Sequence, residues 1–252
     1  MAVMDEFKEE REALKHGTFK QKVQYFWEYY RWHALAVILI GIFAFYMIYM
    51  YATKKEEILY GAILNCYALE NAEAYSREFV EYAGYDPEKY EAGFDSTVSV
   101  NFDEFDVNAS ASAEKLAMYM AAYQLDVMIA GDQIFENYAN GGTFTDIRDH
   151  LTEEQIAEYE PYFYYVDFPL VQQIYEAETN TDTSFDPEIP DPSKPELMED
   201  PIPVGIYVES CEGLMNNYVF QESSGKRVVL GIVSNTTRPE MTAQFIDYLF
   251  KQ

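Results

Sequence analysis

The sequence predicts one transmembrane helix followed by a mainly parallel, three-layer α/β domain. Residues 32–53 contain no Asp, Glu, Lys or Arg, and a charge-free run of this length is typical of a helix that crosses a membrane. After it, strand-like and helix-like segments alternate, which is typical of βαβ units and a parallel sheet. We therefore divide the chain into a cytoplasmic or interfacial helical segment at 1–31, the transmembrane helix at 32–53 and a soluble domain at 54–252.

The segment before the charge-free run also has helical character. Residues 4–15 are expected to form a short charged helix that stops near Gly17. Thr18 can cap a second helix, which should continue unbroken into the span. This second helix is either an interfacial helix or a plain cytosolic extension of the span, since both need the same apolar stripe.

The charge-free run is long enough to cross a bilayer. Its 22 residues reach about 33 Å at a rise of about 1.5 Å per residue, and the hydrocarbon core is about 30 Å thick. Trp27 and Trp32 lie near one end and Tyr46 and Tyr49 lie toward the other, as expected for aromatic side chains at the two interfaces. A buried core helix and a cleaved signal peptide fit less well, because the run is too long and no small-residue cleavage site follows it.

The distribution of charge predicts the orientation of the chain. It carries 17 Lys and Arg against 44 Asp and Glu, a formal net charge of −27. Residues 1–33 hold six basic and six acidic side chains, so the whole net charge falls on the rest of the chain. We expect a cytoplasmic N-terminus and an acidic, extracytoplasmic domain at the cell membrane, with the lipid bilayer as a partner. The same charge excludes nucleic acid as a partner, because its phosphates need cations.

The soluble domain is expected to alternate strands with helices, as judged from its apolar periodicity. The expected strands are 58–68, 97–102, 125–130, 203–210 and 227–234. The expected helices are 72–82, one that begins at Ser112, one that runs from Asp132 to near Gly141, and 239–250. Residues 176–203 break this pattern with six prolines and nine acidic residues against one lysine, and we expect an acidic, proline-rich connector there.

Motifs for catalysis, cofactor binding and metal binding are missing from the sequence. It contains no nucleophile elbow, no zinc-protease motif and no glycine-rich nucleotide-binding motif. His150 is the single histidine of the domain, and residues 178–186 lack the glycine and the terminal glutamate of a calcium-binding EF-hand loop. We therefore expect no catalytic residues, no cofactor and no metal site.

Two cysteines fall in strand-like segments of the predicted domain. An extracytoplasmic location permits a disulfide between Cys66 and Cys211. Two separately buried thiols explain the same sequence equally well, because free cysteine behaves as a small apolar residue. Both alternatives stay open.

Three segments of the domain resemble the first lobe of type 2 periplasmic (extracellular solute) binding proteins. Residues 125–147 (LDVMIAGDQIFENYANGGTFTDI) resemble the family's strand, aromatic-bearing helix, glycine and return to an Asp-Ile pair. Residues 231–250 (GIVSNTTRPEMTAQFIDYLF) are similar to its late strand, short loop and Pro-Glu helix, and residues 58–82 resemble its opening strand and helix. The lead-in FWEYYRWH also resembles single-pass membrane proteins of Gram-positive, clostridia-like bacteria.

The resemblance implies a reduced, one-lobed binding protein fixed to a membrane. Its expected function is the non-catalytic binding of a solute or another ligand outside the cell. The alternative, from a different class, is a structural or assembly protein in which a degenerate binding-protein fold serves as a protein–protein interaction module. The partner is then either a small solute or a protein.

A ligand site is expected where strands of the sheet end. In open α/β sheets, ligands bind outside the carboxyl ends of the strands. Asp132 and Gln133 follow the strand at 125–130, and Asn235 and Thr236 follow the strand at 227–234, so these four side chains are the candidate ligand-binding residues. The alternative is purely local: Asp132 caps its helix, and residues 234–236 turn the chain.

Overall fold

The computed structural model describes residues 18–102, 107–180 and 184–252. The short charged helix predicted at 4–15 lies outside the described residues. The chain divides into two compact units, Met1–Lys54 and Lys55–Gln252.

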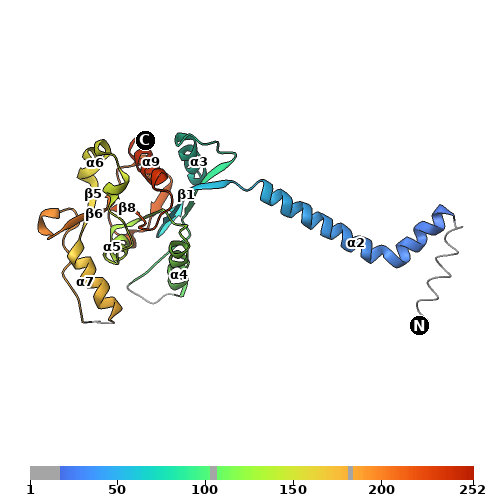
Figure 1. The fold of residues 1–252 in the computed structure, drawn as a ribbon, viewed down its shortest axis with the longest axis horizontal. Coiled ribbons are helices and arrows are strands. Elements are labelled where there is room, and N and C mark those ends of the chain that lie inside the picture. The colour runs from blue at the N-terminus through green and yellow to red at the C-terminus, as the bar shows by residue number, and fades with distance from the viewer. Residues whose placement is uncertain (1–17, 103–106, 181–183) are drawn as a thin grey trace. The chain divides into compact units, whose positions relative to one another are not determined.

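The first unit contains helix α2, Phe19–Ala52, which is continuous over 34 residues (Figure 1). Within it, Tyr30–Ala52 is long and apolar enough to cross a membrane, with a mean hydropathy of 2.2 over 18 residues, and it is the one such helix in the described part of the chain. Its large apolar side chains are exposed, as illustrated by Ile40 and Phe45. The predicted apolar helix, unbroken from its lead-in, is therefore present.

A six-stranded sheet forms the centre of the second unit (Figure 1). In spatial order its strands are β3 (Tyr90–Asp95), β1 (Glu56–Ile63), β4 (Val127–Gly131), β8 (Val228–Ile232), β6 (Pro201–Tyr207) and β5 (Phe163–Asp167). Two short antiparallel strands, β2 (Cys66–Ala68) and β7 (Tyr218–Phe220), form a separate small sheet.

The direction of the strands agrees with the sequence prediction only in part. Strand β1 pairs in parallel with β3 and β4. Strand β8 is antiparallel to both β4 and β6, and β5 is antiparallel to β6. Four of the six strands thus point one way, but every pairing that β8, β6 and β5 make is antiparallel, so the sheet as a whole is mixed.

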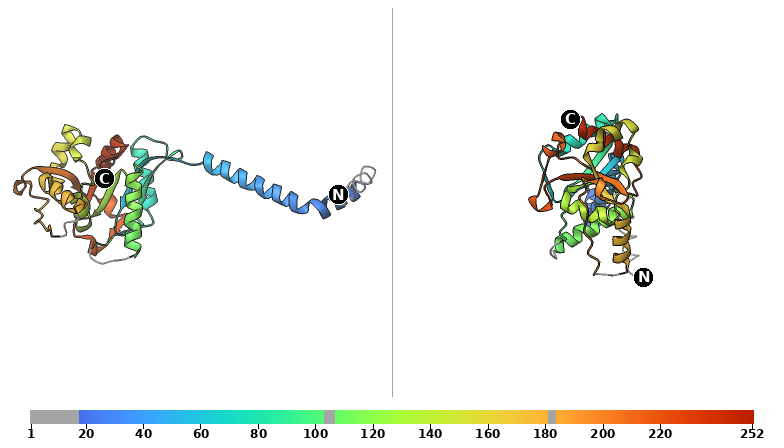
Figure 2. Two further views of the ribbon diagram at one scale, coloured as in Figure 1. Left: turned by 60° about the horizontal axis from the view of Figure 1, so that its bottom comes forward. Right: turned by 90° about the vertical axis from the view of Figure 1, so that its left-hand side faces the viewer.

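Helices cover both faces of this sheet (Figures 1 and 2). One face carries α3 (Ala72–Tyr82), α6 (Glu153–Tyr159) and α9 (Pro239–Phe250), and the other carries α4 (Val107–Ala121), α5 (Asp132–Asn140) and α7 (Phe168–Thr179). The strands supply both cores because their side chains alternate: Leu59 and Ile63 of β1 belong to the first core, and Ala62 belongs to the second. The second unit is therefore a three-layer α/β structure.

Residues 97–102, predicted as a strand, form an irregular segment that belongs to neither sheet of the described chain. The alternation that suggested a strand reports burial: Val98 and Val100 are buried. Their backbone groups bind Asn65 instead of a sheet. The Asn65 side chain donates to Val100 O and accepts from Val100 N, both at 2.8 Å, and Asn65 N donates to Val98 O at 3.0 Å.

The region predicted as a connector, 176–203, is shorter in the structure. Helix α7 extends into its start and strand β6 takes up its end. Between them the described residues run without strands along β5, where Tyr165 N donates to Pro192 O at 2.9 Å. This bond covers part of an edge that would otherwise be open to pairing with another chain.

Candidate functional site

The four candidate residues do not form one site. Because β4 and β8 are antiparallel, Val127 pairs with Ile232 and Gly131 pairs with Val228. The residues that follow β4 and the residues that follow β8 therefore lie at opposite ends of the strands, which we call the two edges of the sheet below. The expectation that both pairs share one edge required parallel strands, and it is wrong.

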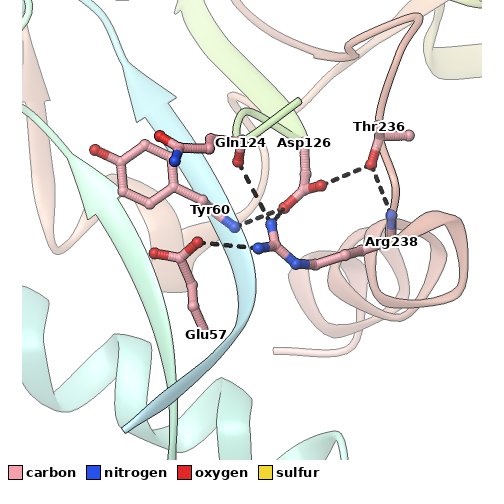
Figure 3. A network of polar contacts seen from close by, with 6 residues as sticks. All are labelled: Glu57, Tyr60, Gln124, Asp126, Thr236 and Arg238. Atoms are coloured by element: carbon pink, nitrogen blue, oxygen red, sulfur yellow. Dashed lines mark hydrogen bonds and ion pairs between the residues drawn. The ribbon is translucent and has the colours of Figure 1, made fainter. Parts of the chain in front are cut away.

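Thr236 belongs to a buried polar network at the edge where β4 begins (Figure 3). The side chain of Asp126 is completely buried. It accepts hydrogen bonds from Thr236 Oγ1 (2.7 Å), Tyr60 N (2.8 Å) and Arg238 Nη1 (2.6 Å). Arg238 also pairs with Glu57 at 3.1 Å. The hydroxyl of Thr236 is thus engaged in a contact that holds three parts of the chain together.

Glu57 shows how burial acts on this network. Desolvation raises the pKa of its carboxyl, although the guanidinium of Arg238 acts in the opposite direction. Its neighbour in the sheet is another carboxylate, Glu91, which also raises the pKa of Glu57. A cavity of about 590 Å³ lies at this edge and is lined in part by Glu57 and Arg238, but the guanidinium of Arg238 is already bound by the carboxylates of Asp126 and Glu57.

Asn235 and Asp132 also have structural partners. Asn235 Nδ2 donates to Met120 O at 2.7 Å, which fixes the loop after β8 to the end of α4. Asp132 Oδ1 accepts from Lys226 N at 2.9 Å and from Gln133 N at 3.1 Å. Asp132 therefore holds the turn at 222–226 against the start of α5. The local alternative, that Asp132 caps this helix, is wrong, because the N-cap is Gly131 and no side chain caps the helix.

Gln133 lines a groove at the other edge of the sheet, where β1 and β4 end. We call it the carboxamide groove. Its volume is about 760 Å³, within the range of about 300–1,000 Å³ that is usual for ligand sites. Its lining residues are Asn65, Ser99, Val100, Asn101, Phe102, Asn108, Ala109, Gln133, Ile134, Asn137, Gln221 and Ser223.

The position of the groove follows from the order of the strands. From β1 the chain passes through α3 on one face to β3, and from β3 it passes through α4 on the opposite face to β4. The connection that leaves the end of β1 leads to α3 on one face, and the connection that leaves the end of β4 leads to α5 on the other face, so the two diverge between β1 and β4. A point of this kind leaves a crevice at the carboxyl ends of the strands, where open α/β sheets bind ligands.

Asn65 builds the floor of the groove. It follows β1, is buried and has a positive φ of 50°. Besides its bonds to the segment 97–102, its carbonyl oxygen accepts from Gln221 N at 2.9 Å. One residue thus joins the end of β1 to two walls of the groove, the segment 97–102 and the segment that begins at Gln221. The sequence signal was an asparagine within the apolar run 58–68, which was predicted as one strand and which the structure divides into β1 and β2. A polar side chain buried in such a run must find partners.

Several polar side chains of the groove have hydrogen-bonding groups that no described residue pairs with. Within the described residues, no hydrogen-bond partner is present for the side chains of Gln133, Gln221, Ser99 and Ser223. Asn137 Nδ2 donates to Gln133 O at 3.0 Å, and its Oδ1 is left for a ligand or water. These groups both donate and accept hydrogen bonds.

Charge is absent from the described lining. Charged residues make up 24% of the chain, yet none of the twelve lining residues is charged. The described residues also include no group of three or more His, Cys, Asp or Glu that could hold a metal ion. Chemically, the groove offers neutral hydrogen bonds beside the apolar surfaces of Phe102 and Ile134.

Comparison with protein-family models, with curated proteins and with solved structures found no match for this chain. The resemblance to type 2 solute-binding proteins rests on three sequence segments, and it stays a prediction.

Proposed function

We propose that the chain is a single-pass membrane protein whose second unit binds a small polar ligand in the carboxamide groove. The observation that carries this proposal is the coincidence of two features at one place. The groove lies where the connections that follow β1 and β4 diverge, and its side chains of Gln133, Gln221, Ser99 and Ser223 present unused hydrogen-bonding groups. Convergent polar groups in a cavity of this size support ligand binding.

The membrane anchor in this proposal is the apolar part of α2. Leaving the side chains of Tyr30–Ala52 exposed to water would be costly, and a bilayer removes that cost. We place the N-terminus in the cytoplasm and the second unit outside. Four flanking cations lie before the span (Lys15, Lys20, Lys22 and Arg31) and two lie after it (Lys54 and Lys55), and this difference and the concentration of the −27 net charge after the span support this orientation.

Binding without catalysis is the activity that this lining supports. General acid–base catalysis requires a titratable side chain within hydrogen-bond reach of the substrate. The twelve lining residues that the structure describes have amide, hydroxyl and apolar side chains. They are suited to hold and orient a ligand. The rival role, a protein–protein module in an assembly, is an outcome of the same experiment.

Thermal unfolding of the full chain in lipid nanodiscs tests the proposal. The panel consists of neutral sugars, amino acids, a dipeptide and small carboxylates. A ligand present at a hundred times its Kd adds about 2.7 kcal/mol to the free energy of unfolding, which raises the Tm by about 5–10 °C for a domain of this size. We expect at least one class of solute to give such a shift.

Two variants locate the binding site. Gln133→Ala combined with Asn137→Ala should reduce or abolish the shift, because both side chains line the groove. Gln173→Ala on α7 removes an exposed carboxamide outside the groove and should leave the shift unchanged. No shift with any solute, together with a protein partner recovered by pull-down, would reject the proposal in favour of the assembly role.

A further inference from the structure

The carboxamide groove continues onto a small apolar surface of the sheet formed by β2 and β7. We infer that its ligand is a short oligopeptide, whose main chain lies in the groove and whose one large apolar side chain packs against Tyr67 and Val219, the exposed pair. This inference rests on the proposed function and adds the class of ligand to it. Three features carry it: the position of the exposed pair beside the groove, its exposure, and free main-chain groups in the groove.

The exposed pair lies in register with a residue that lines the groove. Tyr67 of β2 is opposite Val219 of β7, and the ladder continues to Gln221, whose N–H donates to Asn65 O at 2.9 Å. Gln221 is extended, with φ −71° and ψ 139°. Because side chains alternate along an extended chain, Val219 and Gln221 project from the same face, with Cα atoms about 7 Å apart. Gln221 also lines the groove, so the groove and the exposed pair adjoin on one surface.

The chain leaves this pair uncovered. Tyr67 is 65% exposed and Val219 is 47% exposed, and Leu69, two residues after Tyr67, is 45% exposed. On the opposite face of the small sheet, Cys66 and Tyr218 are buried in the first core. The small sheet thus has one packed face and one free face. The free face is large enough to cover one apolar side chain of a ligand, whereas an acyl chain would need a much larger area.

The groove supplies hydrogen-bonding partners for a peptide main chain. Ser99 lines it, and within the described residues the main-chain N–H and C=O of Ser99 have no partner. The next residue differs, because both main-chain groups of Val100 are bound by the side chain of Asn65. An extended peptide can pair with the free N–H and C=O of one residue, as an added strand does. The carboxamide of Gln133 adds a donor and an acceptor for further peptide groups.

The spacing of these features sets a minimum length for the ligand. The distance of about 7 Å from Gln221 to Val219 corresponds to two residues of extended chain. A single amino acid therefore cannot fill the groove and also cover the exposed pair, whereas a tripeptide spans about 10 Å. We expect the affinity to rise from an amino acid to a tripeptide.

Peptides that differ in one side chain test the inference at constant charge. Calorimetric titration of the full chain in nanodiscs compares triglycine with tripeptides in which leucine or phenylalanine replaces each glycine in turn. Leucine, phenylalanine, glucose and maltose complete the panel. All the tripeptides have the same ionic groups, so charged residues near the groove act on them alike. The best apolar tripeptide should bind about five- to tenfold more tightly than triglycine, because its side chain buries about 40–60 Å² against the exposed pair.

Variants tie this preference to the exposed pair. Tyr67→Thr combined with Val219→Thr removes the apolar surface and keeps residues that suit a strand. Both side chains are exposed, so the melting temperature should stay that of the parent. The preference over triglycine should fall to about twofold or less, while the affinity for triglycine itself is unchanged. Tyr67→Phe keeps the ring and should keep the preference. Tyr175→Thr on α7 removes a ring that is 63% exposed outside the groove and should bind as the parent does.

The outcomes separate the inference from the proposed function. Equal affinity for all tripeptides, or a preference that survives in the double variant, would show that the exposed pair takes no part and that the inference is wrong. Weaker binding by Gln133→Ala would still support the groove as a ligand site. A sugar or a single amino acid that binds more tightly than every tripeptide would also overturn the inference and leave the proposed function standing. If no member of the panel binds, the proposed function itself fails.

Discussion

Asp126 is a carboxylate without contact to solvent, and three donors from two separate segments, Tyr60 in β1 and Thr236 and Arg238 in the loop after β8, complete its hydrogen bonds. A buried charge of this kind is tolerated only while its partners are present. The sequence did not show that Asp126 is buried, because it is one of 44 acidic residues. Its position before a fully buried strand was the available signal.

Asp126→Asn should destabilise the second unit by about 3–5 kcal/mol, because it leaves Arg238 without its buried counter-charge and turns an acceptor into a donor. The melting temperature of the full chain should fall by roughly 10 °C. Glu88→Gln is the control: it breaks a pair with Arg77 whose side chains are 53% and 70% exposed, and such pairs contribute little. Equal melting temperatures for the two variants would contradict this account of the network.

Cys66 and Cys211 are free and buried in the structure. Burial raises the pKa of the Cys66 thiol to about 12 and that of the Cys211 thiol to about 11. Because the thiolate is the reactive form, neither residue should react with iodoacetamide in the folded chain at pH 8. Both should react after unfolding in urea without a reductant, as counted by mass spectrometry. Labelling that requires prior reduction would show a disulfide instead.

The candidate residues illustrate what a single sequence can and cannot supply at this scale. Gln133 was selected because it follows a strand, and it lines the groove. Asp132, Asn235 and Thr236 were selected by the same rule, and each has a structural partner in the chain. Residue type alone does not distinguish these cases, because a capping or turn-forming side chain and a ligand-binding one have the same chemistry.

At the scale of elements, α9 is held to two neighbouring helices by one carboxylate. Asp247 accepts hydrogen bonds from Tyr82 of α3, from Tyr159 of α6 at 3.1 Å and from Lys251 at 2.6 Å. Burial acts to raise the pKa of Asp247, but these hydrogen bonds outweigh it and hold the pKa below the ordinary value of 3.8. The folded state therefore binds this proton less readily than the unfolded state.

The lowered pKa gives a pH dependence with a definite sign. The stabilisation from Asp247 is complete above its ordinary pKa and is lost as the pH falls through the lower value of the folded state. In urea titrations from pH 6 to pH 3, Asp247→Asn should lose less stability with acidification than the parent chain. The exposed Asp186→Asn should follow the parent. Identical slopes for all three proteins would show that the contact has no energetic role.

The elements that periodicity predicted well are those with an apolar face of one clear type. They include α2, β4, α5 and α9. Periodicity reports burial, however, and it does not report pairing: residues 97–102 alternate because they bury Val98 and Val100 against Asn65. Strand direction is a tertiary property as well, so the antiparallel β8 could not be read from its residues. Strand β5 was missed because a run of aromatic residues, Phe163–Tyr165, shows no alternation.

For the molecule as a whole, the asymmetry of charge determines the proposed orientation. A membrane-impermeant protease added to intact protoplasts should degrade the second unit, because an exposed domain is accessible to it, and should leave the N-terminal segment protected. Immunodetection of tags placed at each end gives the result. Protection of the C-terminal tag with loss of the N-terminal one would reverse the orientation, and protection of both would place the protein inside the cell.

The central claim is that a ligand binds at the edge where β1 and β4 end and not at the opposite edge with Asp126 and Thr236. Hydrogen–deuterium exchange of the full chain in nanodiscs tests it most directly, with and without the solute that gives the largest melting shift. The account predicts slower exchange in 97–102 and 221–225, which form walls of the groove, and unchanged exchange in 234–238. Protection in 234–238 without protection at the groove, or no protection with any solute, would contradict it.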